Sequence, residues 1–150
     1  MSLMNLTSGK SLWRGYKYYT ENRVCYKTKT GPGEFEGRVT GSGKTYTVNI
    51  DTAHPRKSKC NCPHANGRRV ICKHMIALYF AVFPAEAAKY YNEVMAYEAE
   101  EERRHEELDN MIYTYINKLS KAELKDLVLE LLYDSTEWQF ERFVRENIDL

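Results

Sequence analysis

Two closely spaced pairs of metal-binding side chains constrain the fold of this chain more than any other feature of its sequence. Cys60-Asn61-Cys62 is followed by nine residues and then by Cys72-Lys73-His74. Thiol and imidazole groups at such spacing are typical of structural zinc sites, which hold the ion in a closed tetrahedron of four ligands. Ligands that flank a single residue need an extended or turning backbone, and Pro63 and Asn66-Gly67 favour turns. We therefore expect zinc to fasten a strand end to a helix start.

The sequence leaves two candidates for the fourth ligand. His74 would lie in the first turn of a helix, which would orient its ring towards Cys60, Cys62 and Cys72. His64 lies two residues after Cys62 and is the alternative ligand. The remaining cysteine, Cys25, falls in a strand pattern, and we expect it to be a buried and unreactive thiol.

Hydrophobic periodicity predicts an α+β fold, in which a small antiparallel sheet carries the zinc-clasped strand–turn–helix and an all-helical C-terminal segment follows. A helix capped by Ser8 or Ser11 precedes strands at residues 24–30, 35–40 and 44–51. A short fourth strand at residues 57–61 would deliver the first two cysteines. The apolar run after Cys72 predicts a buried helix that ends before Pro84. Residues 1–4 resemble an expression remnant before a native start at Met4, so we exclude them from the sequence argument.

The second half of the chain shows only helical patterns. Ser120 to Glu123 predicts a capping box, and Asp134 is the expected cap of a last helix. Between these caps the side chains expected to face inward are Leu124, Leu127, Val128, Leu131 and Leu132. We divide the chain into a zinc-binding module (residues 1–97), a charged helical linker (98–107) and an acidic helical hairpin or bundle (108–150).

The motif Cys-x-Cys-x9-Cys-x-His resembles the SWIM zinc finger. Its surroundings are also similar, with Trp13-Arg14-Gly15-Tyr16 in an aromatic helix, Cys-x-Cys-Pro after the strands, and Cys-Lys-His opening an apolar helix. The resemblance covers about residues 10–85, and residues 119–124 are similar to a helical tail seen in some bacterial members. It implies Cys60, Cys62, Cys72 and His74 as zinc ligands, a role in binding DNA or protein, and no catalysis.

The net charge of +1 conceals two halves of opposite sign. Residues 1–85 carry 14 Lys or Arg and 4 Asp or Glu, whereas residues 86–150 carry 8 and 17. No acidic residue lies between Thr52 and Ala85. The cations closest to the predicted ligands are Arg56, Lys57, Lys59, Arg68, Arg69 and Lys73. Such a cluster is typical of a surface that contacts nucleic-acid phosphates, and Tyr16, Tyr18, Tyr19, Tyr26 and Tyr46 are candidates for stacking on the bases of a single strand.

Nucleotide hydrolysis, other catalysis and membrane spanning are all disfavoured by the sequence. Gly41-Ser42-Gly43-Lys44-Thr45 resembles the end of a phosphate-binding loop, but Arg38 stands where the first glycine would fall and a strand follows instead of a helix. No other catalytic motif is present, and the sequence offers neither a leader nor an apolar stretch long enough for a membrane. We therefore expect a cytoplasmic, non-enzymatic binding protein. The alternative to nucleic-acid contact is an adaptor whose acidic helices dock a protein, with the zinc finger only stabilising the fold.

Overall fold

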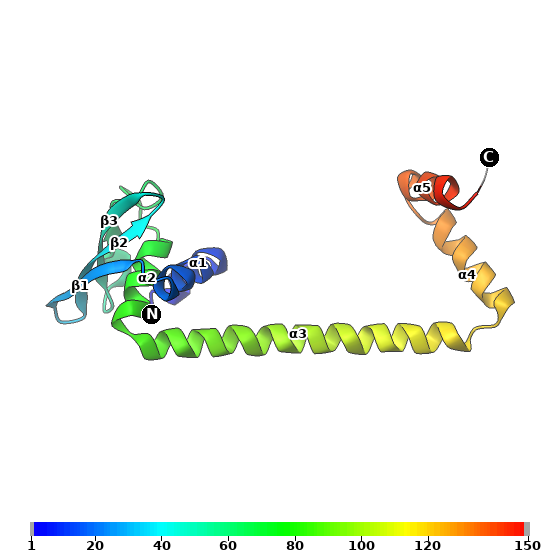
Figure 1. Cartoon of the computed structure of the whole chain (residues 1–150), viewed down its shortest axis with the longest axis horizontal. Helices are drawn as coiled ribbons and strands as arrows, with labels where there is room; N and C mark the ends of the chain where they lie inside the picture. The colour runs from blue at the N-terminus through cyan, green and yellow to red at the C-terminus, as the bar shows by residue number, and fades with distance from the viewer. Residues whose placement is uncertain (1, 149–150) are drawn as a thin grey trace. The chain divides into compact units, whose positions relative to one another are not determined.

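The computed structural model describes residues 2–148 and divides the chain into two compact units, residues 1–95 and 96–150. The first unit is α+β, as predicted, and the second is helical (Figure 1). Among the described residues, no helix combines the length and the apolar character that crossing a membrane requires.

A four-stranded antiparallel sheet with the order β1-β2-β3-β4 forms one layer of the first unit. Its strands are β1 (Val24–Gly31), β2 (Glu34–Gly41), β3 (Lys44–Asp51) and β4 (Lys59–Cys60). Ser42 and Gly43 both have positive φ in the turn between β2 and β3, as a tight hairpin turn requires. The sequence that resembles a phosphate-binding loop is therefore a hairpin. The predicted fourth strand is shorter than expected, because Lys57 belongs to the 3-10 helix η2 (Pro55–Lys57) and Cys62 lies beyond β4.

Helix α2 (Lys73–Val82) is the middle layer, between the sheet and helix α1 (Gly9–Thr20). Seven of its ten residues are buried, which explains why its sequence is apolar on all sides. Ser8 caps α1 by accepting a hydrogen bond from the Ser11 backbone N–H at 3.3 Å. A Cβ on Gly15 would lie 2.4 Å from Ile76 Cγ2, so glycine permits the close packing of α1 on α2.

The core of the first unit includes one residue that sequence analysis left out. Leu3, in the turn before the 3-10 helix η1 (Met4–Leu6), is 1% exposed and belongs to the same buried cluster as Phe80 and Met75. Setting residues 1–4 aside as an expression remnant therefore missed a core residue, Leu3. Leu3 fills space in the core that would otherwise be a cavity, because protein interiors are closely packed.

Cys25 is exposed, in contrast to its predicted burial. Val24 pairs with Val39 and Tyr26 pairs with Arg38, so Cys25 is an extra residue in a β-bulge of the edge strand β1. A bulge interrupts the regular alternation of faces. For this reason the strand pattern of the sequence did not predict the orientation of this thiol.

Helix α3 (Pro84–Lys118) begins at Pro84 and runs without interruption through residues 98–107. Helices α4 (Lys121–Tyr133) and α5 (Glu137–Asn147) follow. The predicted capping box is present at α4, where Ser120 and Glu123 exchange hydrogen bonds of 2.8 and 3.3 Å. The cap of α5 is Thr136, and Asp134 instead ends α4, so the prediction for Asp134 is wrong.

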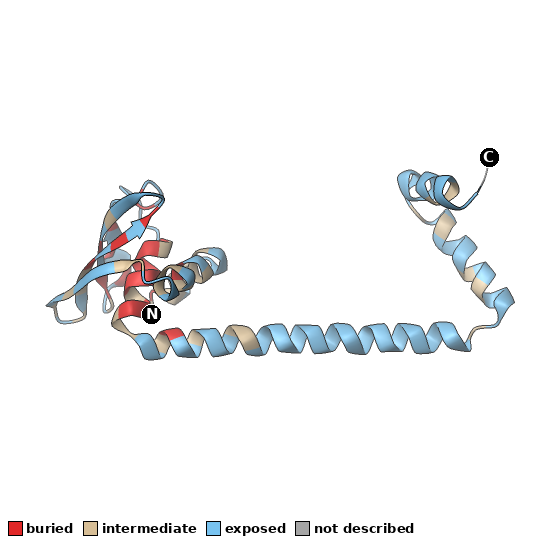
Figure 2. Cartoon of the chain, viewed as in Figure 1, coloured by how far each residue is buried: buried red, intermediate tan, exposed pale blue. Residues whose placement is uncertain are grey.

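Burial differs sharply between the two units (Figure 2). Neither α4 nor α5 contains a buried residue. Of the five α4 side chains predicted to face inward, Val128 is 45% exposed and Leu131 is 62% exposed. Helical periodicity predicts which residues share a face of a helix, but it does not supply the partner that covers that face.

Candidate metal centre

Four side chains from three consecutive segments converge at one end of α2. Cys60 ends β4, and Cys62 is the second residue of the connection of residues 61–71, which we call the knuckle loop. Cys72 is the N-cap residue of α2, and His74 lies in its first turn. Their ligand atoms all lie within 4.8 Å of one another, and all four residues are buried. The strand–turn–helix arrangement expected from the sequence is therefore present.

The spacing Cys-x-Cys brings both thiols to the cluster because Asn61 continues the pairing with β3 and the chain turns after Cys62. Its side-chain oxygen accepts a hydrogen bond from the Thr47 backbone N–H at 3.0 Å, and its own N–H donates to the Thr47 carbonyl at 3.3 Å. The chain then turns: the N–H groups of Ala65 and Asn66 donate to the Cys62 carbonyl at 3.0 and 2.9 Å. Gly67 adopts a positive φ of 70°, which glycine tolerates without strain.

The imidazole of His74 presents Nδ1 to the cysteines. Nδ1 lies 3.8 Å from Cys60 Sγ and 3.9 Å from Cys72 Sγ. In a zinc tetrahedron with Zn–S of about 2.3 Å and Zn–N of about 2.0–2.1 Å, sulfur and nitrogen ligands stand roughly 3.6 Å apart. The spacing of these atoms therefore fits a zinc ion at the centre of the cluster.

Packing fixes the His74 ring in this orientation. Tyr46 stacks on it with ring centroids 4.5 Å apart, and Tyr18 meets it edge-on at 5.5 Å. Nε2 is buried without a hydrogen-bond partner among the described residues, close to Gly41. With Nδ1 as the donor to a metal, Nε2 carries the proton of the neutral ring. His64 is exposed and lies outside the four-residue cluster.

The thiols of Cys60 and Cys72 lie within 4.8 Å of each other and are strongly coupled. The neighbouring Cys60 thiol lowers the pKa of the Cys72 thiol to about 4, and the Cys72 thiolate raises the pKa of Cys60 far above its usual range. Without metal, two thiolates side by side would repel each other. A divalent cation removes this conflict because it stabilises every thiolate it binds.

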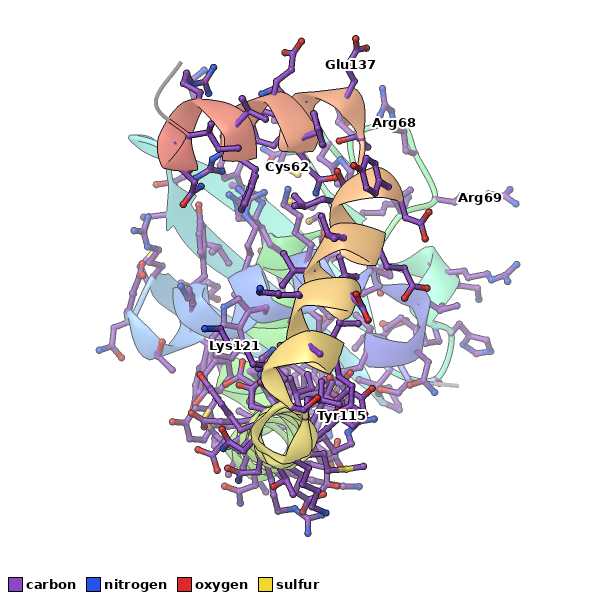
Figure 3. The ribbon with its side chains drawn as sticks, turned by 90° about the vertical axis from the view of Figure 1, so that its right-hand side faces the viewer. Cys62, Arg68, Arg69, Tyr115, Lys121 and Glu137 are labelled. Carbon is purple, nitrogen blue, oxygen red and sulfur yellow. The ribbon has the colours of Figure 1, made fainter. Side chains whose placement is uncertain are left out.

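Five of the six predicted basic residues line one open groove of about 690 Å³. Arg56 and Lys57 come from η2 and Lys59 from β4. Arg68 and Arg69, which are labelled in Figure 3, come from the knuckle loop. All five are exposed, and none pairs with a carboxylate within residues 2–148. The described residues that line this basic groove include no Asp or Glu.

Lys73 does not join the basic groove. Its ammonium donates a hydrogen bond to the Tyr18 hydroxyl at 2.7 Å and lies 4.4 Å from the centre of the Tyr18 ring. Together with Arg14 and His64, it lines a separate pocket of about 270 Å³ beside Cys62, Cys72 and His74. A zinc ion with three thiolates and a neutral imidazole carries a net charge of −1, which Lys73 and Arg14 offset. No signal in the sequence predicts this division, because all six cations are close to the ligands along the chain.

Comparison with known proteins agrees with this geometry. Residues 46–83 match the family model of the SWIM zinc finger. Searches of curated proteins and of solved structures each returned no match. The matched segment extends from β3 through the knuckle loop to the end of α2, and it includes all four clustered side chains. This chain therefore contains a SWIM zinc finger at residues 46–83.

Proposed function

We propose that the first unit is a zinc-stabilised module that binds nucleic acid through the basic groove and catalyses no reaction. Four side chains close a tetrahedron around the ion and leave no coordination position for water or substrate, which is the arrangement of structural zinc sites. We assign Cys60, Cys62, Cys72 and His74 as the zinc ligands, because their side chains converge and the spacing of their ligand atoms fits a zinc tetrahedron.

One observation carries the nucleic-acid assignment: the gathering of five unpaired cations in one groove next to the metal cluster. Lys59 immediately precedes Cys60, and Arg68 and Arg69 lie in the loop between Cys62 and Cys72. The ligands thus fix the backbone on both sides of the groove. A rigid row of cations without carboxylates favours a polyanion, and release of counterions from phosphates would drive binding.

The test is binding of a fluorescently labelled oligonucleotide to the full chain, followed by polarisation over a range of salt concentrations. We expect affinity to fall steeply with salt. The double variant Arg68→Ala/Arg69→Ala should reduce the slope of log affinity against log salt by about two, one for each phosphate contact removed. Its zinc content should remain that of the wild type, because neither residue is a ligand.

A matched control removes two exposed cations elsewhere, Lys10 and Lys89. The variant Lys10→Ala/Lys89→Ala has the same net charge as the groove variant, so an equal loss of affinity would show that only total charge matters. Absence of salt-sensitive binding in the wild type would contradict the proposal.

A second candidate function is protein binding by the helical unit. Many large apolar side chains are exposed on the helices of residues 96–148, among them Tyr115 of α3, which is labelled in Figure 3. The most exposed of them are Tyr97, Met111, Tyr113, Leu131, Tyr133 and Trp138. Apolar surface of this extent is typical of an interaction site. Binding to a protein that survives high salt and is lost in Leu131→Asp would favour this adaptor function.

A further inference from the structure

The sheet of the first unit has one covered face and one open face. Val39, Val48 and Ile50 point towards α2 and are at most 2% exposed. The register places several rows of side chains on the opposite face, because residues that pair across strands share a face, and two of these rows lie in the middle of the sheet. One row is Tyr26, Arg38 and Thr47, and the other is Thr28, Glu36, Asn49 and Lys59. We call these two rows the open face.

The open face continues directly into the basic groove. Thr47, Asn49 and Lys59 belong to both, since they line the groove and stand in the two rows. Neighbouring strands lie about 4.8 Å apart, so Tyr26 is about 10 Å from Thr47 across β2. An extended ligand in the groove therefore needs to reach across only two strands to contact Tyr26.

Of the five tyrosines that the sequence offered for stacking, the structure leaves Tyr26 with an accessible ring. Tyr16 and Tyr19 pack against Phe80, Tyr18 is covered by Lys73, and Tyr46 stacks on His74. Tyr26 is 48% exposed. The guanidinium carbon of Arg38 lies 5.9 Å from the centre of its ring.

The β-bulge at Cys25 is the reason that Tyr26 faces outward. Val24 contacts the core, so uninterrupted alternation would have turned Tyr26 towards α2 as well. The extra residue reverses the alternation, and Lys27 points inward instead, where its ammonium donates to the Ala81 carbonyl at 2.5 Å. Bulges commonly redirect a side chain in this way beside functional surfaces.

We propose that the open face and the basic groove together bind single-stranded nucleic acid, with an unpaired base stacked on Tyr26 and Arg38 and the phosphates held in the groove. This inference rests on the proposed function and specifies its ligand. A ring on an open sheet reaches the face of a base most readily in a single strand, because the bases of a duplex stack on one another, and base–aromatic stacking tolerates any sequence. Glu36 lies two residues from Arg38 on the same face of β2. Its carboxylate repels phosphate, so the surface around Tyr26 and Arg38 favours bases over the phosphate backbone. Thr28, Thr47 and Asn49 provide neutral hydrogen-bonding groups beside it.

The experiment compares the full chain with Tyr26→Ala and Tyr26→Phe in binding to single-stranded DNA, single-stranded RNA and duplex DNA of equal length. Tyr26→Ala should weaken binding to at least one single strand about fivefold or more, as loss of one stacked base does. Duplex affinity should not change, and Tyr26→Phe should bind like the wild type. Tyr97→Ala is the matched control, because Tyr97 is 66% exposed but lies on α3.

Two further measurements separate the possible failures. Zinc content and melting temperature establish that Tyr26→Ala is folded, and a photoreactive uracil in the single strand should form its cross-link at Tyr26 in the wild type. Salt-sensitive binding of all ligands with no effect of Tyr26→Ala, or an equal effect on the duplex, would overturn this inference and leave the proposed function standing. Absence of any nucleic-acid binding would overturn both.

Discussion

The contact between α1 and α2 leads to a sharp prediction for Gly15. Alanine there would place its Cβ 2.4 Å from Ile76 Cγ2 and 2.9 Å from the Lys73 carbonyl oxygen. Ile76 is fully buried and the carbonyl is backbone, so neither can move aside without shifting a helix. Overpacking costs about 1–3 kcal/mol, and contacts this short indicate the upper part of that range, about 2–3 kcal/mol; the better helix propensity of alanine offsets about 1 kcal/mol. We expect Gly15→Ala to destabilise the module by about 1–2 kcal/mol.

This loss corresponds to a fall of about 4–16 °C in melting temperature for a unit of this size, measurable by circular dichroism with saturating zinc. Gly9→Ala is the control within the same helix, because a Cβ at Gly9 meets nothing within 4 Å. Its melting temperature should be unchanged or slightly higher. Equal stability of Gly15→Ala and Gly9→Ala would refute the packing of α1 on α2 described here.

Two predictions concern pH. The zinc affinity of the full chain, measured by competition with a chromogenic chelator, should fall as the pH is lowered, because zinc binds thiolates and must displace the protons of its ligand thiols, among them Cys60 with its raised pKa. A constant affinity between about pH 8 and pH 6 would contradict this ligand set. The backbone N–H of His54 donates to Asp51 Oδ1 at 2.7 Å and lowers the pKa of that carboxyl. The ionised Asp51 carboxylate therefore stabilises the fold above the unfolded-state pKa, and this stabilisation is lost as the pH falls through the lower folded-state pKa. Asp51→Asn should flatten the dependence of melting temperature on pH below about pH 5. An unchanged curve would exclude this role of Asp51.

Local sequence signals predicted the elements that short-range chemistry determines. Ser8, Pro84 and the Ser120–Glu123 box each mark a helix boundary as expected, because caps and proline act on the adjacent backbone. The spacing of the metal-binding residues was also informative, since a tetrahedral site restricts the backbone between its ligands.

Features that depend on distant contacts were not predictable. The burial of Leu3 depends on a core assembled from residues far along the chain. The orientation of Tyr26 depends on a bulge that no residue type announces, and the position of Lys73 depends on Tyr18, more than 50 residues away. The exposure of Val128 and Leu131 follows from the absence of a covering element among the described residues, which a periodic pattern does not reveal.

The central claim is that one zinc ion holds β4, the knuckle loop and α2 together, and metal analysis of purified protein tests it most directly. Protein from zinc-replete medium should contain about one zinc per chain. Cys72→Ser should lose the ion, and amide hydrogens of residues 46–83 should then exchange faster, whereas His64→Ala should keep both metal and protection. Zinc-free protein with fully protected amides in this segment, or loss of zinc in His64→Ala with retention in His74→Ala, would contradict the assignment.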